Sequence, residues 1–362
     1  MNNRERIINC VTGKEIDRTP FICYFGAWGE TCERWMKEGA KDWDAWRDPA
    51  IGFDEGAANL TEYVNHYFNP PFEFKILKEE GERYIYQDTL GVVNEANKGR
   101  SAIPKILKNP VTCREDWEKI KRERLVPDFK GRIPADFADT CEMLKKSGKA
   151  IQVGAFPYGV FGTMRDLIGV EDLMFWFYDE PELVYDMMQD LTDFWLGIYE
   201  EIAKYIQIDI IHIWEDMSGK TGSMIGPSTM EEFMLPNYRK IKAFADAKDI
   251  PVIVVDTDGR CDELIPIFHS VGVNLMLPFE VQAGNDIVDL RRRFPYMAMF
   301  GGIEKMNVAK GRDAIDCEME KIKPLMGKPG YIPQLDHTIP PEIGYQDYLY
   351  FCKRLKETCG KK

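Results

Sequence analysis

The sequence lacks several features that mark well-known classes of protein. No stretch of 18 consecutive apolar residues occurs, so no transmembrane helix is expected. The first twenty residues contain no apolar core of the kind found in secretory signals. Glycine-rich phosphate loops are also missing, since neither G-x-G-x-x-G nor G-x-x-x-x-G-K-[ST] occurs. We therefore expect a soluble, cytoplasmic protein, and an open nucleotide-binding sheet is disfavoured.

Positive charge, histidine and paired cysteine are also scarce. The chain has 47 Lys and Arg against 60 Asp and Glu, a net charge of −13, which disfavours binding to nucleic acid or to an anionic membrane surface. It has only four histidines, and its nine cysteines include no C-x-x-C pair. The cysteines are typical of reduced thiols that fill a core, rather than of disulfides or a cysteine zinc finger.

What the sequence does contain is a regular alternation after about residue 145. With 362 residues, 44% of them hydrophobic, the chain is long enough for a large globular fold. Short apolar runs that predict strands occur at 150–156, 208–214, 251–255, 273–278, 297–300 and 331–335. Between and after them lie helical patterns at about 165–177, 181–205, 229–247, 261–271, 287–294, 312–323 and 346–357.

This alternation predicts an α/β fold with a parallel sheet and outer helices. Six strand–helix units, with room for two more strands earlier in the chain, favour a (β/α)8 TIM barrel with an N-terminal extension. We expect residues 1–362 to form one barrel domain. Residues 1–145 include the extension and a hairpin, indicated by strand-like segments at 83–88 and 92–94.

Polar residues follow nearly every predicted strand, at the end where barrel enzymes carry their chemistry. The strand ends are followed by Glu215-Asp216, Asp256-Thr-Asp258-Gly, Phe279-Glu280, Gly301-Gly-Ile-Glu304 and Asp336-His337. Such a ring suits a metal held by carboxylates and imidazole, or a metal-free acid/base site. The structural alternative is that these residues cap the following helices.

The four histidines differ in their surroundings. His212 lies inside an apolar run and His269 inside a helical pattern, so we expect both to be structural. The aromatic setting of His66 fits either a pocket or the core. His337 follows a strand and precedes two prolines, and we expect it to have a functional role.

Taken together, these stretches resemble the uroporphyrinogen decarboxylase superfamily, and within it the corrinoid-dependent methyltransferases of the O-demethylase type. The matching segments are Arg4-Glu-Arg-Ile-Ile-Asn9, Asp17-Arg-Thr-Pro20, Tyr86-Gln-Asp-Thr-Leu-Gly91, Gly226-Pro-Ser-Thr-Met-Glu-Glu-Phe-Met-Leu-Pro236, Asp256-Thr-Asp-Gly259 and Gly330-Tyr-Ile-Pro-Gln-Leu-Asp-His-Thr-Ile-Pro-Pro341. They occur in order along nearly the whole chain. The resemblance implies a single (β/α)8 barrel.

The chain departs from the decarboxylases of this family in an N-terminal loop. Those enzymes bind the carboxylates of the porphyrinogen through arginines in this loop, whereas residues 21–30 contain none. The loop instead suits a small apolar or aromatic substrate. The candidate substrate-binding residues are Tyr24, Phe25, Trp28, Phe156, Tyr158 and Glu280. The aromatic members can equally belong to the core.

The zinc methyltransferases of the family imply a metal site. Their His-x-Cys and late Cys ligands fall by position on Asp256, Asp258 and His337 of this chain. Two carboxylates and an imidazole form a harder set that can hold zinc and polarise an oxygen. Glu215 is the candidate for a fourth ligand or an acid, with Asp216 equally plausible. If no metal binds, a protonated member of the group serves instead.

The function implied is methyl transfer from a small O-methyl compound, such as an aryl methyl ether, or from an N-methyl compound. The acceptor is the cobalt of a corrinoid (cobalamin) held by a separate protein, since the Asp-x-His-x-x-Gly signature of cobalamin-binding modules is absent. The alternatives are a divergent decarboxylase-like lyase that needs no metal, and a carrier or sensor that binds without turnover. A homo-oligomer is an open prediction.

Overall fold

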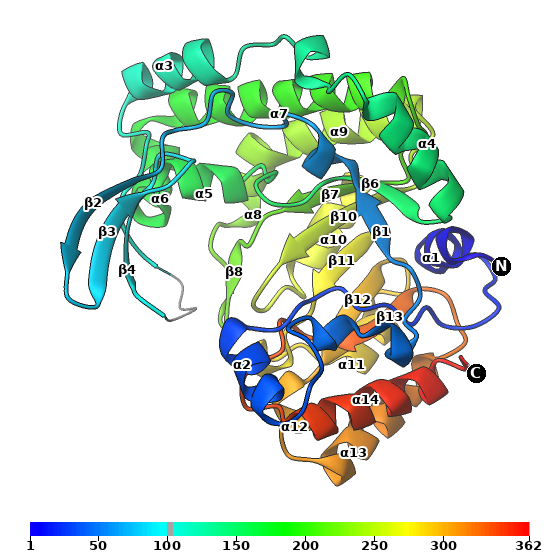
Figure 1. Ribbon diagram of the computed structural model, residues 1–362. Coiled ribbons are helices and arrows are strands. Elements are labelled where there is room, and N and C mark those ends of the chain that lie inside the picture. Colours follow the sequence, from blue (N-terminus) through cyan, green and yellow to red (C-terminus); the bar gives the residue numbers. More distant parts are fainter. Residues whose placement is uncertain (100–103, 362) are drawn as a thin grey trace.

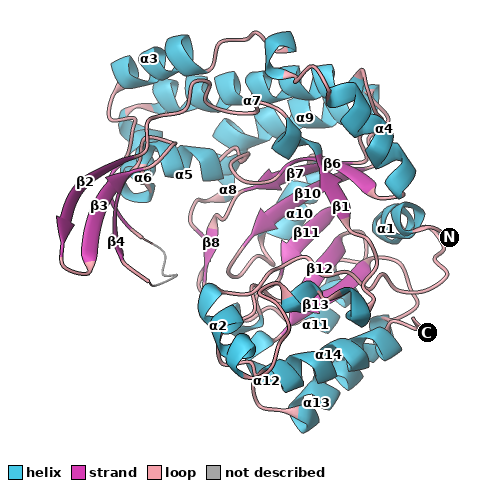
Figure 2. Ribbon diagram, viewed as in Figure 1, coloured by secondary structure: helices cyan, strands magenta, loops and turns pink. Residues whose placement is uncertain are grey.

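A parallel sheet of seven strands forms the centre of the protein in this computed structural model, which describes residues 1–99 and 104–361 (Figures 1 and 2). All neighbouring strands are parallel. Their order is β1 (Ala57–Asn59), β6 (Ala150–Gly154), β7 (Ile210–Trp214), β10 (Val252–Thr257), β11 (Leu275–Pro278), β12 (Ala298–Ile303) and β13 (Tyr331–Leu335). The six strands predicted from the sequence are thereby confirmed, with bounds shifted by up to three residues.

The strands alternate between the inside of the curled sheet and a shell of helices. The inward side chains of the strands form one apolar cluster with residues of helix α1 (Asn3–Val11). The strand members are Ile210, Val252, Val254, Leu275, Leu277, Ala298, Phe300 and Ile332. The intervening side chains, such as Ile211, Ile253 and Met276, face the helices and belong to the larger core cluster. A strand buried on both faces reads as a nearly continuous apolar run, as these segments do.

Helices surround the sheet on its outer side (Figure 2). They include α3 (Arg114–Arg124), α4 (Phe137–Ser147), α5 (Gly162–Ile168), α6 (Val170–Asp179), α7 (Pro181–Ala203), α9 (Leu235–Ala247), α10 (Leu264–Ser270), α11 (Ile287–Arg293), α13 (Arg312–Ile322) and α14 (Tyr345–Thr358). The connecting segments contain the helices α2 (Gly29–Lys37), α8 (Pro227–Thr229) and α12 (Lys305–Val308), and the two-residue strands β8 (Ser218–Gly219) and β9 (Gly222–Ser223). Among the described residues, no helix is long and apolar enough to cross a membrane.

The predicted closed eight-stranded barrel is confirmed only in part, because the sheet stays open between β1 and β13. Residues 20–27 run along this opening without forming a strand. The Phe21 carbonyl accepts a hydrogen bond from the Asp54 amide, at 2.7 Å, just before β1. At the other side, Ala27 forms a single parallel bridge with Ile339, just after β13. An extended segment with few ladder bonds therefore occupies the place of the eighth strand.

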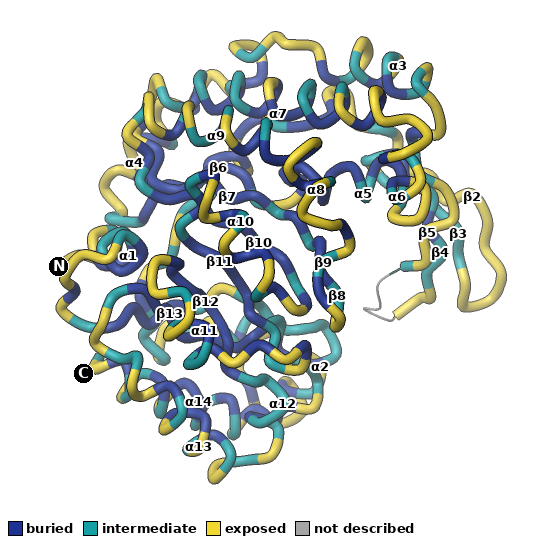
Figure 3. The backbone as a smooth tube through the Cα atoms, turned by 180° about the vertical axis from the view of Figure 1, so that it is seen from behind, coloured by how far each residue is buried: buried dark blue, intermediate teal, exposed yellow. Residues whose placement is uncertain are grey.

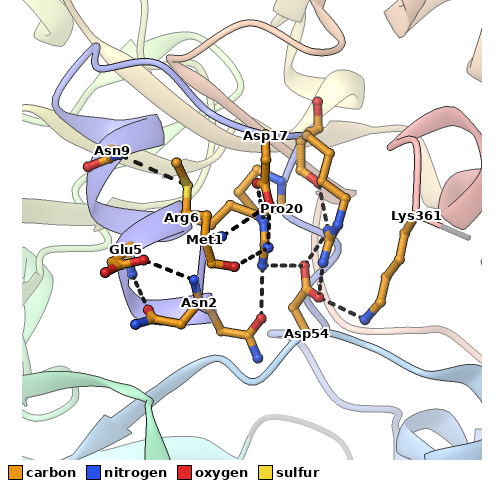
Figure 4. Close-up of polar contacts among 12 residues, drawn as sticks. Met1, Asn2, Glu5, Arg6, Asn9, Asp17, Pro20, Asp54 and Lys361 are labelled. Carbon is orange, nitrogen blue, oxygen red and sulfur yellow. Dashed lines mark hydrogen bonds and ion pairs between the residues drawn. The ribbon is translucent and has the colours of Figure 1, made fainter.

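Helix α1 (Asn3–Val11) closes the amino-terminal end of the curled sheet, with Ile7, Cys10 and Val11 in the inner apolar cluster. Ion pairs around it join both ends of the chain (Figure 4). Arg6 donates to Asp17, while Arg18 and Lys361 both donate to Asp54. Burial acts to raise the pKa of Asp54, but these hydrogen bonds outweigh it and bring the pKa to about 2.

A four-stranded antiparallel sheet projects from one side of the barrel (Figure 1). It consists of β2 (Lys75–Glu80), β3 (Arg83–Gln87), β4 (Val93–Asn97) and β5 (Lys105–Lys108). It contains the hairpin expected at 83–94, and both edge strands are exposed along their whole length (Figure 3). That residues 1–362 act as one domain stays a prediction.

Candidate functional site

Asp258 and His337 meet at the carboxyl end of the curled sheet. Asp258 follows β10 and His337 follows β13, and Oδ2 of the aspartate lies 3.5 Å from Nε2 of the imidazole. The Phe25 ring stacks on the other side of His337, with 5.2 Å between ring centroids. About 29% of the His337 side chain is exposed, so that a molecule at the mouth can reach it.

The carboxylate beside it determines the protonation of His337. The interaction with Asp258 raises the pKa of His337 and outweighs burial, which acts in the opposite direction. Lys305 lowers the pKa of His337, and Glu280 raises it. His337 is thus held toward its cationic form, in which Nε2 carries a proton that can be donated.

A second pair lies deeper, where His212 on β7 approaches Asp256 on β10. His212 Nε2 lies 3.4 Å from Asp256 Oδ2, and Nδ1 lies 3.3 Å from the Tyr24 hydroxyl. Sequence reasoning expected His212 to be structural because it lies in an apolar run. The alternation of side chains along a strand could have shown its direction. Ile210, two residues earlier on β7, and Val254, paired with His212 on β10, both face the interior, so His212 faces it as well.

Glu215 lies one residue beyond β7 and faces away from the mouth. Its side chain is fully buried and accepts hydrogen bonds from the amides of Val160, Phe161 and Gly162 and from the Tyr238 hydroxyl. Burial raises its pKa, while these four donors lower it. The carboxylate therefore fixes the turn before α5 against α9. This placement does not suit the predicted role of ligand or acid.

Asp216, the next residue, lies at the mouth, unlike Glu215. It has φ of +41°, and its carboxylate lies 2.5 Å from the guanidinium of Arg165, which also lies over the Trp214 ring. Burial raises the pKa of Asp216; Arg165 opposes this, and Asp258 and Asp256 add to it. Its neighbour Asp166 was not identified from the sequence, and burial raises the pKa of Asp166 to about 6.

Glu280 connects two loops at the mouth. Its carboxylate accepts a hydrogen bond from the Gly259 amide at 3.0 Å and lies 3.6 Å from the Lys305 ammonium. Asp336 is fully buried and accepts from the amides of Val281 and Lys305. These contacts position the loops after β10, β11 and β12, so Glu280 has a loop-anchoring role in addition to its predicted contact with substrate.

The predicted aromatic residues do not all lie together. Tyr24 packs against Phe25 and against Phe300 on β12, and Phe25 packs on the inner cluster. Phe156 is exposed and packs edge-on against Trp214 at the rim. Tyr158 is buried in the outer core beside α7, which is the alternative that the sequence left open. Trp28 is half-buried at the start of α2.

The predicted zinc ligands are not gathered around one point. In the part of the chain that the structure describes, no three His, Cys, Asp or Glu side chains are arranged to hold one ion. Asp258 pairs with His337, Asp256 pairs with His212, and Glu215 is turned outward. As placed, the side chains do not fit the tetrahedral set, and the zinc site stays a prediction.

Comparison with known proteins identifies the family. The model of the family described as uroporphyrinogen decarboxylase (URO-D) matches residues 87–358. The chain belongs to this family. Similar curated proteins include the uroporphyrinogen decarboxylase of Trichlorobacter lovleyi, 24% identical over 277 residues, or 71% of this chain and 76% of that protein. That of Geotalea uraniireducens is 23% identical over 283 residues, with the same shares covered.

A solved structure supports the fold of this URO-D family member. A methyltransferase from Methanosarcina mazei superimposes with a TM-score of 0.62 at 14% sequence identity, covering 99% of each chain. At this identity the likeness concerns the fold alone. It covers the N-terminal extension as well as the barrel. The family predicted from the sequence motifs is confirmed.

Proposed function

We propose that this protein transfers a methyl group from a small O-methyl compound to the cobalt of a corrinoid held by a separate protein. The observation that carries the proposal is the pair of Asp258 and His337 at the open mouth, beside Phe25. Support also comes from the URO-D family and from the methyltransferase with the same fold.

Asp258 and His337 can assist the breaking of a carbon–oxygen bond. When a reduced cobalt centre attacks the methyl carbon, the bonding electrons pass to the departing oxygen, which becomes basic. His337 donates its Nε2 proton to that oxygen, and Asp258 stabilises the cationic imidazole before the transfer. Solvent at the exposed mouth returns the proton afterwards. At the end of these steps the methyl group is on cobalt, and the departing oxygen has become the hydroxyl group of the product.

The charges at the mouth disfavour a polycarboxylate substrate. Arg165 is paired with Asp216, and Lys305 lies between Glu280 and Asp336. Residues 21–30 contribute no arginine. A substrate with many carboxylates would meet paired cations and the acidic side chains of Asp256 and Asp258. A small, uncharged ether avoids that repulsion.

The test is methyl transfer to added cob(I)alamin, with 2-methoxyphenol as donor and methylcobalamin as the measured product. We expect wild type to form methylcobalamin and His337→Gln to be slower by about 100-fold or more. His269→Gln changes an exposed histidine on α10 and should react like wild type. Carbon dioxide release from a carboxylate donor without methyl transfer would favour the lyase alternative. Equal rates for His337→Gln and wild type would refute the role of His337.

A further inference from the structure

A cavity of about 640 Å³ extends from the inside of the curled sheet, below Tyr24, to the exposed residues Glu62 and Tyr63. The inward apolar side chains Ile22, Ile210, Val254, Leu277, Phe300 and Ile332 form one part of its walls, and polar groups form the rest. This volume is in the range of small-molecule pockets, and barrels of this kind usually fill their interior with side chains. Asp258 and His337 are not among the residues that line it, so the cavity is distinct from the acid pair at the mouth.

Two buried polar side chains line this cavity, and in the described residues the Gln152 amide and the Nε2 atom of His212 form no hydrogen bond. Gln152 on β6 is 8% exposed, and no hydrogen bond joins its side-chain amide to another described residue. His212 on β7 is 1% exposed, and its Nε2 atom has no hydrogen-bond partner. Buried polar groups are nearly always paired, so the Nε2 atom of His212, which lies 3.4 Å from Asp256 Oδ2 without a hydrogen bond to it, requires an explanation.

Strand register places both groups on the same side of the cavity. Gln152 is paired with Ile210, and two residues further on Gly154 is paired with His212. Gly154 carries no side chain, and the β6 and β7 backbones approach closely at this level. Both side chains face inward from neighbouring strands.

The surroundings of His212 fix what its ring offers to a ligand. The Asp256 carboxylate, 3.4 Å from Nε2, favours a hydrogen on that nitrogen. The Tyr24 hydroxyl then donates to Nδ1 at 3.3 Å. Nε2 is therefore a donor, and the Gln152 amide provides two donors and an acceptor. Together they match oxygen atoms such as a hydroxyl next to an ether.

The cations at the cavity argue against an anionic ligand. Arg47 and Lys149 both line it, but Arg47 is paired with Asp44 and Lys149 lies 2.9 Å from Glu55. Glu62, also in the lining, adds negative charge. A carboxylate in the cavity would therefore have to break existing ion pairs.

We propose that this cavity binds a small uncharged molecule with an apolar body and neighbouring oxygen substituents, and that Gln152 and His212 select it. Because the cavity is distinct from the acid pair at the mouth, this binding does not rest on the proposed function. The apolar walls remove the body of the ligand from water, and the two polar side chains recognise its oxygens.

The experiment measures binding of three probes by calorimetry: 2-methoxyphenol, 2-ethyltoluene without oxygen, and anionic 2-methoxybenzoate. We expect wild type to bind 2-methoxyphenol at least about tenfold tighter than either other probe. Gln152→Leu should lose the preference over 2-ethyltoluene, and its Tm without ligand should equal or exceed that of wild type, since an unpaired buried amide is removed. Gln346→Leu, the same change at an exposed position on α14, should retain the preference.

A second measurement follows ligand binding in the wild-type protein and does not use Gln152→Leu. Ring resonances of the four histidines are assigned by single substitution, and 2-methoxyphenol is added to wild type. We expect the His212 signal to shift and the His269 signal to stay. No binding, equal binding of the three probes, or an unmoved His212 signal would overturn the inference. So would a lower Tm of Gln152→Leu with its preference intact. Selective binding without methyl transfer would refute only the proposed function.

Discussion

The carbonyl oxygen of His212 lies 2.0 Å from the point where a Cβ atom on Gly154 would be placed. Gly154 ends β6 with φ of +94° and is paired with His212 across the sheet. The two strands can approach at this level only because position 154 carries no side chain.

Gly154→Ala should therefore destabilise the protein by about 3 kcal/mol, because it combines a backbone clash with a left-handed φ. The matched control is Gly148→Ala, which also has a left-handed φ, +71°, but nothing within 4 Å of the added atom. We expect that control to cost about 1 kcal/mol. Urea unfolding of both variants measures the difference, and equal losses would contradict the account.

Glu215→Gln should cost about 2–4 kcal/mol, because an amide nitrogen would face groups that all donate to the carboxylate. Glu232→Gln, an exposed change on the segment Met230–Met234, should be nearly neutral. Thermal and urea unfolding give the comparison. Full stability of Glu215→Gln together with a loss of bound metal would instead restore the role of Glu215 as a ligand.

Asp54→Asn should lower the free energy of unfolding at pH 7 by about 2 kcal/mol. This figure follows from the difference between the pKa of Asp54 in the folded protein, about 2, and its ordinary value of 3.8. A lowered pKa in the folded state stabilises above the ordinary value, and the contribution is lost as the pH falls through about 2. The deficit of the variant should therefore shrink from pH 4 downward. Asp44→Asn, which removes an exposed ion pair with Arg47, serves as the control. A pH-independent deficit would show that charge is not its cause.

Asp258→Asn should lower the pKa of His337, because it removes the carboxylate that raises it. The pH dependence of methyl transfer should then move to lower pH, since the imidazole loses its proton earlier. Titration of the His337 ring signal by NMR tests this, with the His269 signal as the internal reference. If the titration of His337 is unchanged in Asp258→Asn, the two residues do not interact, and the proposed acid pair is refuted.

The alternation of strands and helices, and the polar residues that follow the strands, could be predicted well from the sequence. The segments 331–335 and 181–205 correspond to β13 and to α7, because buried parallel strands and long amphipathic helices leave clear local patterns. The placement of Asp258 and His337 at one mouth follows from the same reasoning, since parallel strands present their carboxyl ends on one side.

Side-chain direction was harder to predict, as Glu215 and His212 demonstrate. Glu215 follows β7 as expected but faces the helices, where four donors surround it. His212 lies in the middle of an apolar run, yet it faces the cavity. In a strand buried on both faces, composition does not distinguish inside from outside, and only the register with neighbouring strands does.

The sequence by itself determined the family, the order of strands and helices, and the set of polar residues at the strand ends. These depend on local periodicity and on short motifs that need no partner. The tertiary structure decided that the sheet stays open beside residues 20–27, that Asp258 pairs with His337, and that Gln152 and His212 share one cavity. These relationships join residues far apart in the chain, and their geometry is set by packing and register.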